Sequence, residues 1–493
     1  MGETLLEADY VIVGAGAVGL TMADTLVAET AASVVIVDRR ARPGGHWNDA
    51  YPFVRLHSPS ATYGVNSLAL GSGRIDEVGL NRGLHELAGG AEICAYFDRV
   101  LQERLLPSGR VTWLPMHEVQ AAEATEGTAA DDASGVAISL VNGRHRRLVA
   151  RRRWIDATWA DTQVPATHGP DFEVAEGVTL LTPTELTQWR RPAAGHVIVG
   201  GGKTALDTAL WLLEHGVHPD SITWIRPREA WLLNRANVQP TPAFAQRAIE
   251  ALTLELEAAR DARSLPDLFS RLEAARLLMR IDRTVEPTMY RCAIVSEAEL
   301  EQLRRIRRVV RLGRVRAIEA RRIVLERGEI ATSPEHVHLH CSTRGLPRRP
   351  PQPVFSGRRV VPQYVRRCSP TFSAAFVAHV EAAIDAGDDV KNALCEPVPV
   401  PEVPLDWLRM QLIAARNQLR WSQRPELQPW LRGSRLEAYA GLFEQAASAA
   451  AADDRWASLL ARLRQARAPG LERLAELLRT TRRVSQDAAT VRS

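Results

Sequence analysis

Gly-Ala-Gly-Ala-Val-Gly at residues 14–19 decides the fold of the first part of this chain. The motif follows an apolar run of β type at 10–13 and opens a helical stretch over about 18–28. A second β run follows at 34–37. A strand, a glycine turn, a helix and a strand in this order predict a βαβ unit with parallel strands.

Each glycine of this motif has a separate physical role. Gly14 allows a tight turn, Gly16 lets the backbone approach a pyrophosphate, and Gly19 lets the helix pack closely on the strand. The free N–H groups at the helix N-terminus attract an anion. Asp38 ends the second strand, where a carboxylate can accept hydrogen bonds from a ribose diol. We therefore expect these residues and the adjacent Arg39 to contact a dinucleotide.

A second glycine motif, Gly-Gly-Gly-Lys-Thr-Ala, lies at residues 200–205. It stands between a β run at 196–199 and a helix expected over about 204–215, and a further β run follows at 222–225. The two units are too far apart for the short repeats of a solenoid. The sequence predicts an α/β fold, with two nested Rossmann-like dinucleotide-binding domains, a helical insertion and a helical C-terminal region.

The stretch Arg-Pro-Gly-Gly-His-Trp at 42–47 is not a general feature of dinucleotide folds. Together with the pair Tyr51-Pro52, it resembles the class B flavoprotein monooxygenases, which include the flavin-containing and Baeyer–Villiger monooxygenases. The resemblance covers roughly the first 380 residues. It implies that the first unit binds FAD under this loop. Gly45 would face the pyrophosphate, His46 would replace the family's Thr, and Trp47 would lie near the flavin.

The second motif resembles the family's NADP-binding pattern, Gly-x-Gly-x-Ser-x-x-Asp, with Asp207 at its end. Arg226 ends the next β run, no acidic residue stands there, and a guanidinium can pair with a 2′-phosphate. NADPH is therefore expected in preference to NADH. The residues expected to contact it are Gly200, Gly202, Lys203, Thr204 and Arg226.

Two later segments complete the expected cofactor site. Residues 341–345 resemble the linker at which the chain crosses between the FAD and NADP domains, which adds Thr343. A helix expected over 371–386 would point its N-terminus at the pyrimidine end of the flavin, where its dipole stabilises negative charge. This adds Phe372 and Ser373, with plain core packing as the alternative.

The sequence departs from the family where substrate and nicotinamide should meet. Where the family has Tyr-Pro-Gly-x-x-x-Asp, this sequence has Phe53 in place of Gly and His57 in place of Asp. The Baeyer–Villiger fingerprint is also absent from residues 172–189. We take His57 and Arg55 as candidate catalytic residues. A histidine here would change its charge between roughly pH 5 and 8. A loop histidine bonded to backbone is the alternative.

The resemblance implies an FAD-dependent, NADPH-using monooxygenase that acts on a small organic substrate with O2 through a flavin C4a peroxide. One alternative is a flavin reductase, oxidase or dehydrogenase without oxygen insertion. Another is a nucleotide-bound interaction protein without enzymatic activity, against which the two intact glycine motifs count. No residue of the sequence discriminates between the first two.

Composition adds mainly exclusions. The 493 residues carry a net charge of only +4, which demands neither nucleic acid nor a membrane surface. No signal peptide or membrane span is evident, so a cytoplasmic protein is expected. A homodimer is a further possibility for its assembly. Five cysteines without Cys-x-x-Cys indicate neither a zinc site nor a redox-active dithiol. His336, His338 and His340 alternate along one strand face, and we expect packing there and no metal.

These features divide the chain into four parts. Residues 1–160 form the first part of the FAD-binding domain, and 161–335 form the NAD(P)-binding domain with a helical insertion at 240–285. Residues 336–395 return to the FAD-binding domain. Residues 396–493 form the C-terminal helical region.

Overall fold

The computed structural model describes residues 4–121 and 133–490. The first glycine motif lies in an eight-stranded sheet with the order β21-β22-β8-β1-β2-β5, to which β6 and β7 are added beside β8. β1 (Thr4–Val13), β2 (Val34–Val37) and β8 (His145–Asp156) run parallel, and α1 (Ala17–Glu29) links β1 to β2. The expected βαβ unit is confirmed. The acidic stretch expected as a turn near 121–134 lies mostly outside the described residues.

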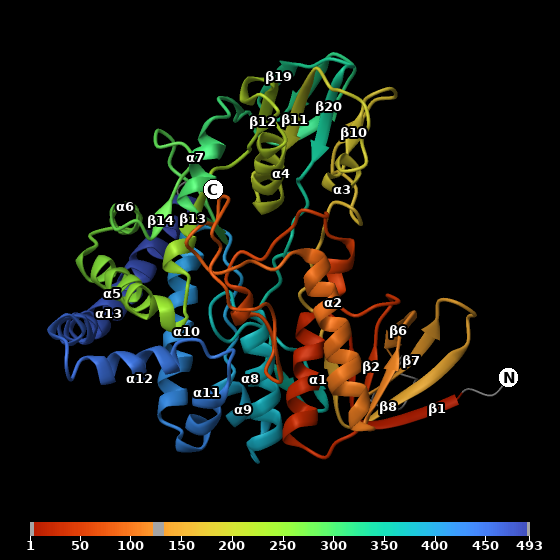
Figure 1. Ribbon diagram of the computed structural model, residues 1–493, viewed down its shortest axis with the longest axis vertical. Coiled ribbons are helices and arrows are strands. Elements are labelled where there is room, and N and C mark those ends of the chain that lie inside the picture. The colour runs from red at the N-terminus through yellow and green to blue at the C-terminus, as the bar shows by residue number, and fades with distance from the viewer. Residues whose placement is uncertain (1–3, 122–132, 491–493) are drawn as a thin grey trace.

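The second glycine motif belongs to a separate five-stranded sheet. Its order is β10-β20-β11-β12-β16, and all paired strands are parallel. α4 (Lys203–Glu214) joins β11 (Gly195–Val199) to β12 (Ile222–Ile225), as the sequence predicts. β21 and β22, after this unit in the chain, return to the first sheet, so the α/β fold with two nested Rossmann-like units is confirmed (Figure 1).

The other strands of the two large sheets are β5 (Val111–Leu114), β6 (His117–Ala121), β7 (Ser134–Ser139), β10 (Leu180–Leu181), β16 (Arg308–Val310), β20 (His336–His340), β21 (Phe355–Ser356) and β22 (Arg359–Val360). Two small sheets were not anticipated, because most of their strands are only two to five residues long. They are formed by β13 (Ala230–Asn234), β14 (Leu278–Met279) and β15 (Met289–Val295), and by β9 (Glu173–Val174), β17 (Val315–Ile318), β18 (Arg322–Leu325) and β19 (Gly328–Ala331).

The insertion expected at 240–285 contains two helices. α5 (Ala245–Asp261) ends before Ser264, whose hydroxyl accepts a hydrogen bond from the Asp267 amide and caps α6 (Leu265–Ala274). Pro266 lies in the first turn of α6, where its missing N–H costs nothing. The capping residue and the proline together divide the apolar pattern into two helices.

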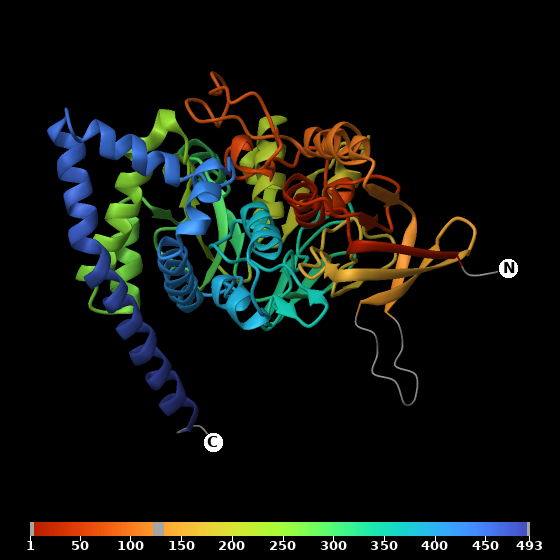
Figure 2. The same cartoon turned by 90° about the horizontal axis from the view of Figure 1, so that it is seen from below.

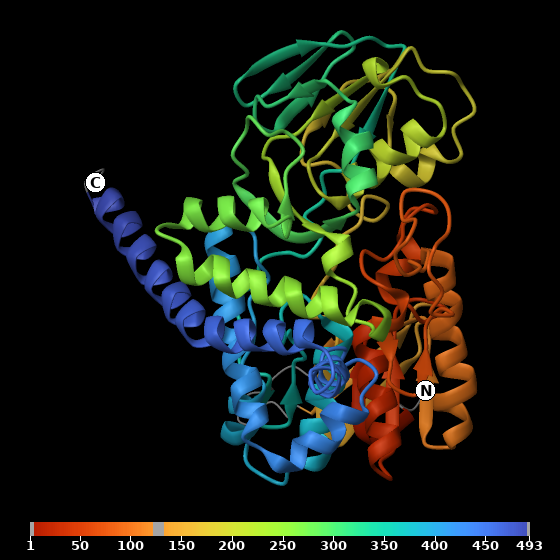
Figure 3. The same cartoon turned by 60° about the vertical axis from the view of Figure 1, so that its left-hand side comes forward.

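The C-terminal helices pack on this insertion. α13 (Asp454–Thr490) lies along α5, and Figure 3 shows the two side by side. At Gly470 a Cβ would lie 2.7 Å from the Leu256 carbonyl oxygen, so glycine allows the two backbones to approach. The far end of α13 projects away from the rest of the molecule (Figure 2). The remaining long helices are α2 (Gly90–Val100), α7 (Glu297–Arg304), α8 (Pro370–Ala383), α10 (Pro404–Ser422) and α12 (Ala440–Ala449).

The cysteines and the apolar helices bear on what the composition was expected to exclude. A disulfide joins Cys292 to Cys368, a pairing that the sequence analysis did not anticipate. Cysteines 76 positions apart in the chain give no spacing signal. Within the described ranges, no helix is long and apolar enough to cross a membrane.

Candidate functional site

The first glycine loop has a backbone that only glycine can adopt. Gly14 has a φ of +100°, and its amide donates to the Val37 carbonyl at 2.7 Å. A Cβ on Gly19 would lie 1.9 Å from the Gly14 carbonyl oxygen. The loop therefore fixes α1 tightly against β1, as the motif predicts.

The loop at Gly44 and Gly45 lies directly on this turn. The Gly44 amide donates to the Ala15 carbonyl at 2.8 Å, and a Cβ on Gly45 would meet the Gly16 Cα at 2.9 Å. No side chain of the described residues caps the N-terminus of α1, and its first turn holds no acidic residue. Its N–H groups are thus available to an anion, and this glycine-lined turn fits a pyrophosphate.

Asp38 holds the glycine loop in place. Its side chain is buried, and its two oxygens accept hydrogen bonds from the Ala15 amide at 2.6 Å and the Arg40 amide at 2.8 Å. A carboxylate oxygen can accept more than one hydrogen bond, so a contact with a ribose hydroxyl remains compatible with this role. Arg39 is exposed beside it.

His46 and Trp47 are fixed in the loop after these glycines. The Trp47 indole N–H donates to the Tyr63 hydroxyl at 2.9 Å, and the rings of His46 and Trp47 lie 5.0 Å apart. Burial, with a smaller contribution from the nearby Arg40, lowers the pKa of His46 to about 4. The imidazole is therefore neutral at physiological pH.

The second glycine loop repeats this arrangement. Gly200 has a φ of +136°, and a Cβ there would lie 2.4 Å from the Cys341 carbonyl oxygen. A Cβ on Gly202 would meet no atom of the described chain within 4 Å. As at α1, α4 begins without a side-chain cap or an acidic first turn in the described structure. This second helix N-terminus also fits a pyrophosphate.

The two units meet where the loop after Trp47 reaches α4. The Tyr51 hydroxyl donates to Asp207 Oδ2 at 2.7 Å, and Lys203 forms an ion pair with Asp207 Oδ1. The ring of Phe53 stacks on Trp211 at 5.2 Å. Burial, and then the charge of Asp207, raise the pKa of Tyr51 well above its ordinary value, so Tyr51 stays a hydrogen-bond donor.

His57 lies in the same contact, between Lys203 and Arg235. Burial, and then these two positive charges, lower the pKa of His57 well below its ordinary value. The expectation that His57 changes its charge between pH 5 and 8 is therefore wrong, because the ring is held neutral. Arg55 is exposed, and no described residue forms a hydrogen bond or ion pair with its side chain.

Arg235 fixes the main chain at His57. Its side chain is 1% exposed and forms two hydrogen bonds with the Glu299 carboxylate, at 2.9 and 2.7 Å. It also donates to the His57 carbonyl and to Asn81 Oδ1, each at 3.2 Å. This buried cation therefore ties the loop of the first unit to the second.

Arg226 is placed otherwise than expected. It is 2% exposed, forms an ion pair with Glu229 at 3.1 Å and lies over the Trp224 ring. Its Nε and Nη1 are buried without a partner among the described atoms. The expectation that Arg226 offers its guanidinium to an incoming phosphate is wrong for this conformation, because its surface is covered. The side chain of Arg228 is 37% exposed and pairs with Glu402 at 2.9 Å.

The side chains of Phe372 and Ser373 lie in the core, while the expected contact of the α8 N-terminus with the flavin concerns backbone N–H groups and stays a prediction. The two residues are 2% and 1% exposed. Phe372 packs on Phe376 and Trp421, and the Ser373 hydroxyl donates to the Ser369 carbonyl. Neither side chain has free surface for a cofactor. Thr343 is half-buried after β20, near the second glycine loop.

The alternating histidines of β20 are hydrogen-bonded to neighbouring groups. The two ring nitrogens of His338 bond to the Thr179 carbonyl at 3.1 Å and the Thr332 hydroxyl at 2.8 Å. The nitrogens of His340 bond to the His168 carbonyl at 3.2 Å and the Ser342 hydroxyl at 3.1 Å. These hydrogen bonds to neighbouring residues explain the alternating histidines of β20 as part of the packing around the strand.

The sequence interpretation missed three residues of the contact between the units: Tyr51, Asp207 and Arg235. Tyr51 and Asp207 stand in motifs that were noticed, but nothing in either motif indicates that they meet. Arg235 has no motif, and only its burial and its partners identify it.

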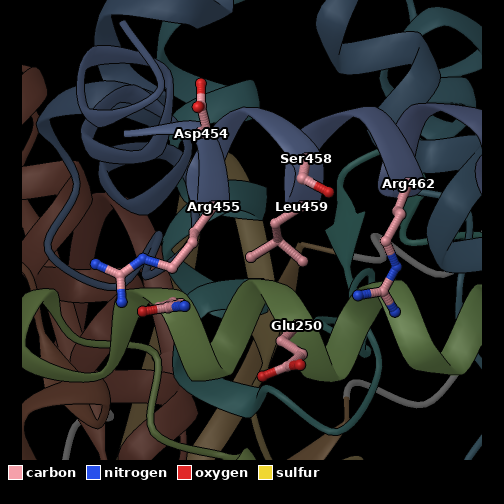
Figure 4. Close-up of a pocket in the computed structure, with 7 residues that line it drawn as sticks. Glu250, Asp454, Arg455, Ser458, Leu459 and Arg462 are labelled. Carbon is pink, nitrogen blue, oxygen red and sulfur yellow. The ribbon is translucent and has the colours of Figure 1, made fainter. Parts of the chain in front are cut away.

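A polar groove of about 350 Å³ lies elsewhere, between α5 and α13 (Figure 4). Arg455 and Arg462 extend from α13 into it. Arg462 is held by Glu257 at 2.8 Å and Arg455 by Asp453 at 3.2 Å. The groove is a seam between packed helices and includes no residue of the glycine loops. Its lining consists of Gln246, Glu250, Asp454, Arg455, Ser458, Leu459 and Arg462.

Comparisons with known proteins agree with this description. The family model of the NAD(P)-binding Rossmann-like domain matches residues 12–75, which include the first glycine loop and Asp38. The uncharacterized protein Rv2000 of Mycobacterium tuberculosis is 47% identical over 448 residues, which cover 89% of this chain and 79% of that protein. The uncharacterized protein Mb2023 of Mycobacterium bovis matches to the same extent. The chain belongs to the family of these mycobacterial proteins.

Solved structures similar to the chain include two monooxygenases. The flavin-containing monooxygenase from Stenotrophomonas maltophilia is 16% identical, with a TM-score of 0.43, over 76% of this chain and 97% of that one. The polycyclic ketone monooxygenase from Thermothelomyces thermophila is 13% identical, with a TM-score of 0.49, over 89% of this chain and 86% of that one.

Proposed function

We propose that the chain is an FAD-dependent, NADPH-using oxidoreductase that acts as a monooxygenase on a small organic substrate. The observation that carries this proposal is the pair of uncapped helix N-termini behind glycine turns, in two units joined through Tyr51 and Asp207. Two dinucleotides held at these turns would have their reactive ends near one contact. The resemblance of the loop at 42–47 to flavoprotein monooxygenases supports FAD in the first unit.

In this proposal, Gly14, Gly16 and the N-terminus of α1 hold the FAD pyrophosphate, with Asp38 at the ribose. Gly200, Gly202 and the N-terminus of α4 hold the coenzyme. Bound FAD would supply hydride acceptance and the reaction of its reduced form with O2.

In this proposal, the contact between the units would shield the reacting groups from water. Asp207 neutralises Lys203 and holds the Tyr51 hydroxyl, so the loop at 51–57 stays closed on α4. His57 is neutral beside Lys203. We therefore propose that its ring forms a hydrogen bond with the coenzyme or the substrate and does not take up a proton. Exclusion of solvent favours oxygen transfer over loss of the electrons to peroxide.

Gly16→Val should yield a folded protein without flavin. A Cβ at Gly16 would have 3.6 Å to the Gly45 Cα, so the chain can accept it, but the valine methyl groups would occupy the pyrophosphate position. The measurement is the flavin absorbance of the purified protein, with circular dichroism for the fold. Gly169→Val, at an exposed position with open space around its Cβ, is the matched control. Full flavin content in folded Gly16→Val would refute the assignment.

Arg228→Ala should raise the apparent KM for NADPH about tenfold or more and leave that for NADH nearly unchanged. A charged hydrogen bond to a 2′-phosphate contributes about 1.5–3 kcal/mol, and Arg228 is the exposed arginine beside the second loop. Steady-state kinetics with both coenzymes measure this. Arg322→Ala, which removes an exposed side chain of β18, is the control. An equal rise for both coenzymes would contradict NADP specificity at this residue.

Rapid mixing of the reduced protein with O2 separates oxygen insertion from simple oxidation. A monooxygenase should transfer an oxygen atom to substrate, with one product formed per NADPH consumed. Stoichiometric hydrogen peroxide under all conditions would favour the oxidase or reductase alternative.

A further inference from the structure

The Cys292–Cys368 disulfide joins two elements that the chain separates widely. Cys292 lies in β15, and Cys368 lies two residues before α8, which packs on α1 of the first unit. Their Cα atoms are 6.7 Å apart, within the range that disulfides span. Both cysteines are half-buried. We therefore expect a small reagent to reach the bond in the folded protein.

A β-bulge aims Cys292 at its partner. In the pairing of β13 with β15, Trp231 is opposite Tyr290, but Leu233 is opposite Ile294. Three residues of β15 thus face one residue of β13, and Cys292 at their centre has a φ of +54°. Bulges of this kind turn a side chain out of the ladder, often at functional positions.

The other end of the bond has the same backbone feature. Arg367, next to Cys368, has a φ of +33°. Left-handed conformations at non-glycine residues persist only where the surroundings hold them. With one on each side of the bond, opening the disulfide frees two strained positions, which favours the reduced form.

We propose that Cys292–Cys368 is an exchange site for low-molecular-weight thiols. A thiolate attacks one Sγ, forms a mixed disulfide with it and expels the other as a thiolate, which takes a proton from water. A second thiol attacks the mixed disulfide, so that the small disulfide leaves and two cysteine thiols remain. The cysteine pair gains two electrons and the small thiol is oxidised. The exchange releases β15 from the segment before α8, and it does not depend on flavin binding.

The test uses the full-length protein and a glutathione redox series without denaturant. Differential alkylation and peptide mass spectrometry should find Cys292 and Cys368 cross-linked after purification in air, and opened together as the share of reduced glutathione rises. Cys94→Ser, which removes a half-buried free thiol, should open over the same range. In Cys292→Ser, the remaining Cys368 thiol should take up one glutathione.

Two results would overturn the proposal: recovery of both cysteines as free thiols from the air-purified protein, or opening of the bond only after the protein is unfolded. The flavin content of each variant is measured in parallel. Failure of the exchange with flavin retained is thereby distinguished from failure of the proposed oxidoreductase function.

Discussion

Arg235→Met should lower the free energy of unfolding by about 3 kcal/mol, because it removes a fully buried cation and leaves the half-buried Glu299 carboxylate without its ion-pair partner. It also removes the donor to the His57 carbonyl, which fixes the loop of the first unit at the contact. Urea unfolding followed by circular dichroism measures the loss. We expect slower flavin reduction by NADPH as well, since the loop at 51–57 is released.

Two control variants distinguish the loss of this ion pair from a general effect of replacing arginine by methionine. Arg322→Met breaks an exposed pair with Glu319 and should cost less than about 1 kcal/mol. Arg235→Met combined with Glu299→Met removes both charges of the pair and should recover part of the loss, although it also deletes the capping interaction of Glu299 with Ser296. A loss below 1 kcal/mol for Arg235→Met alone would show that the pair does not hold the units together.

The sequence predicted the parts of this molecule whose constraints are local. The turns at Gly14 and Gly200 require a positive φ and a close approach of two backbone segments. Glycines close together in the sequence indicate such a turn. Strand, turn and helix could therefore be placed in both units, including the start of α8 at Pro370. Helical spacing alone could not show the break at Ser264, because the apolar pattern continues across it.

Side-chain surroundings were not predictable in the same way. The position of Arg226 at a strand end was correct, but Glu229, three residues later, folds back and covers it. Tyr51 meets Asp207 from 156 positions away, and no local pattern encodes such a contact. The charge state expected for His57 failed for the same reason, since Lys203 and Arg235 reach it from another unit.

Stability should fall as the pH decreases from 7.5 to 5, because five half-buried or buried histidines have surroundings that favour the neutral ring. Burial lowers the pKa of each of them, and for His46 the value is about 4. In the unfolded chain a histidine has a pKa near 6.5, so below that pH the unfolded state binds more protons than the folded one. The sign is therefore a loss of stability on acidification. The histidines are His46, His57, His196, His338 and His340.

His46 alone should account for about 2 kcal/mol of this loss by pH 5, from a pKa near 4 in the folded state and 6.5 in the unfolded state. Urea unfolding at pH 7.5 and pH 5 measures it, and His46→Asn should reduce the difference by that amount. His218→Asn is the control, because the His218 side chain is 73% exposed and should leave the difference unchanged. Stability that stays constant or rises between pH 7.5 and 5 would mean that these rings are reached by protons in the folded protein, and the neutral role assigned to His57 would fail with it.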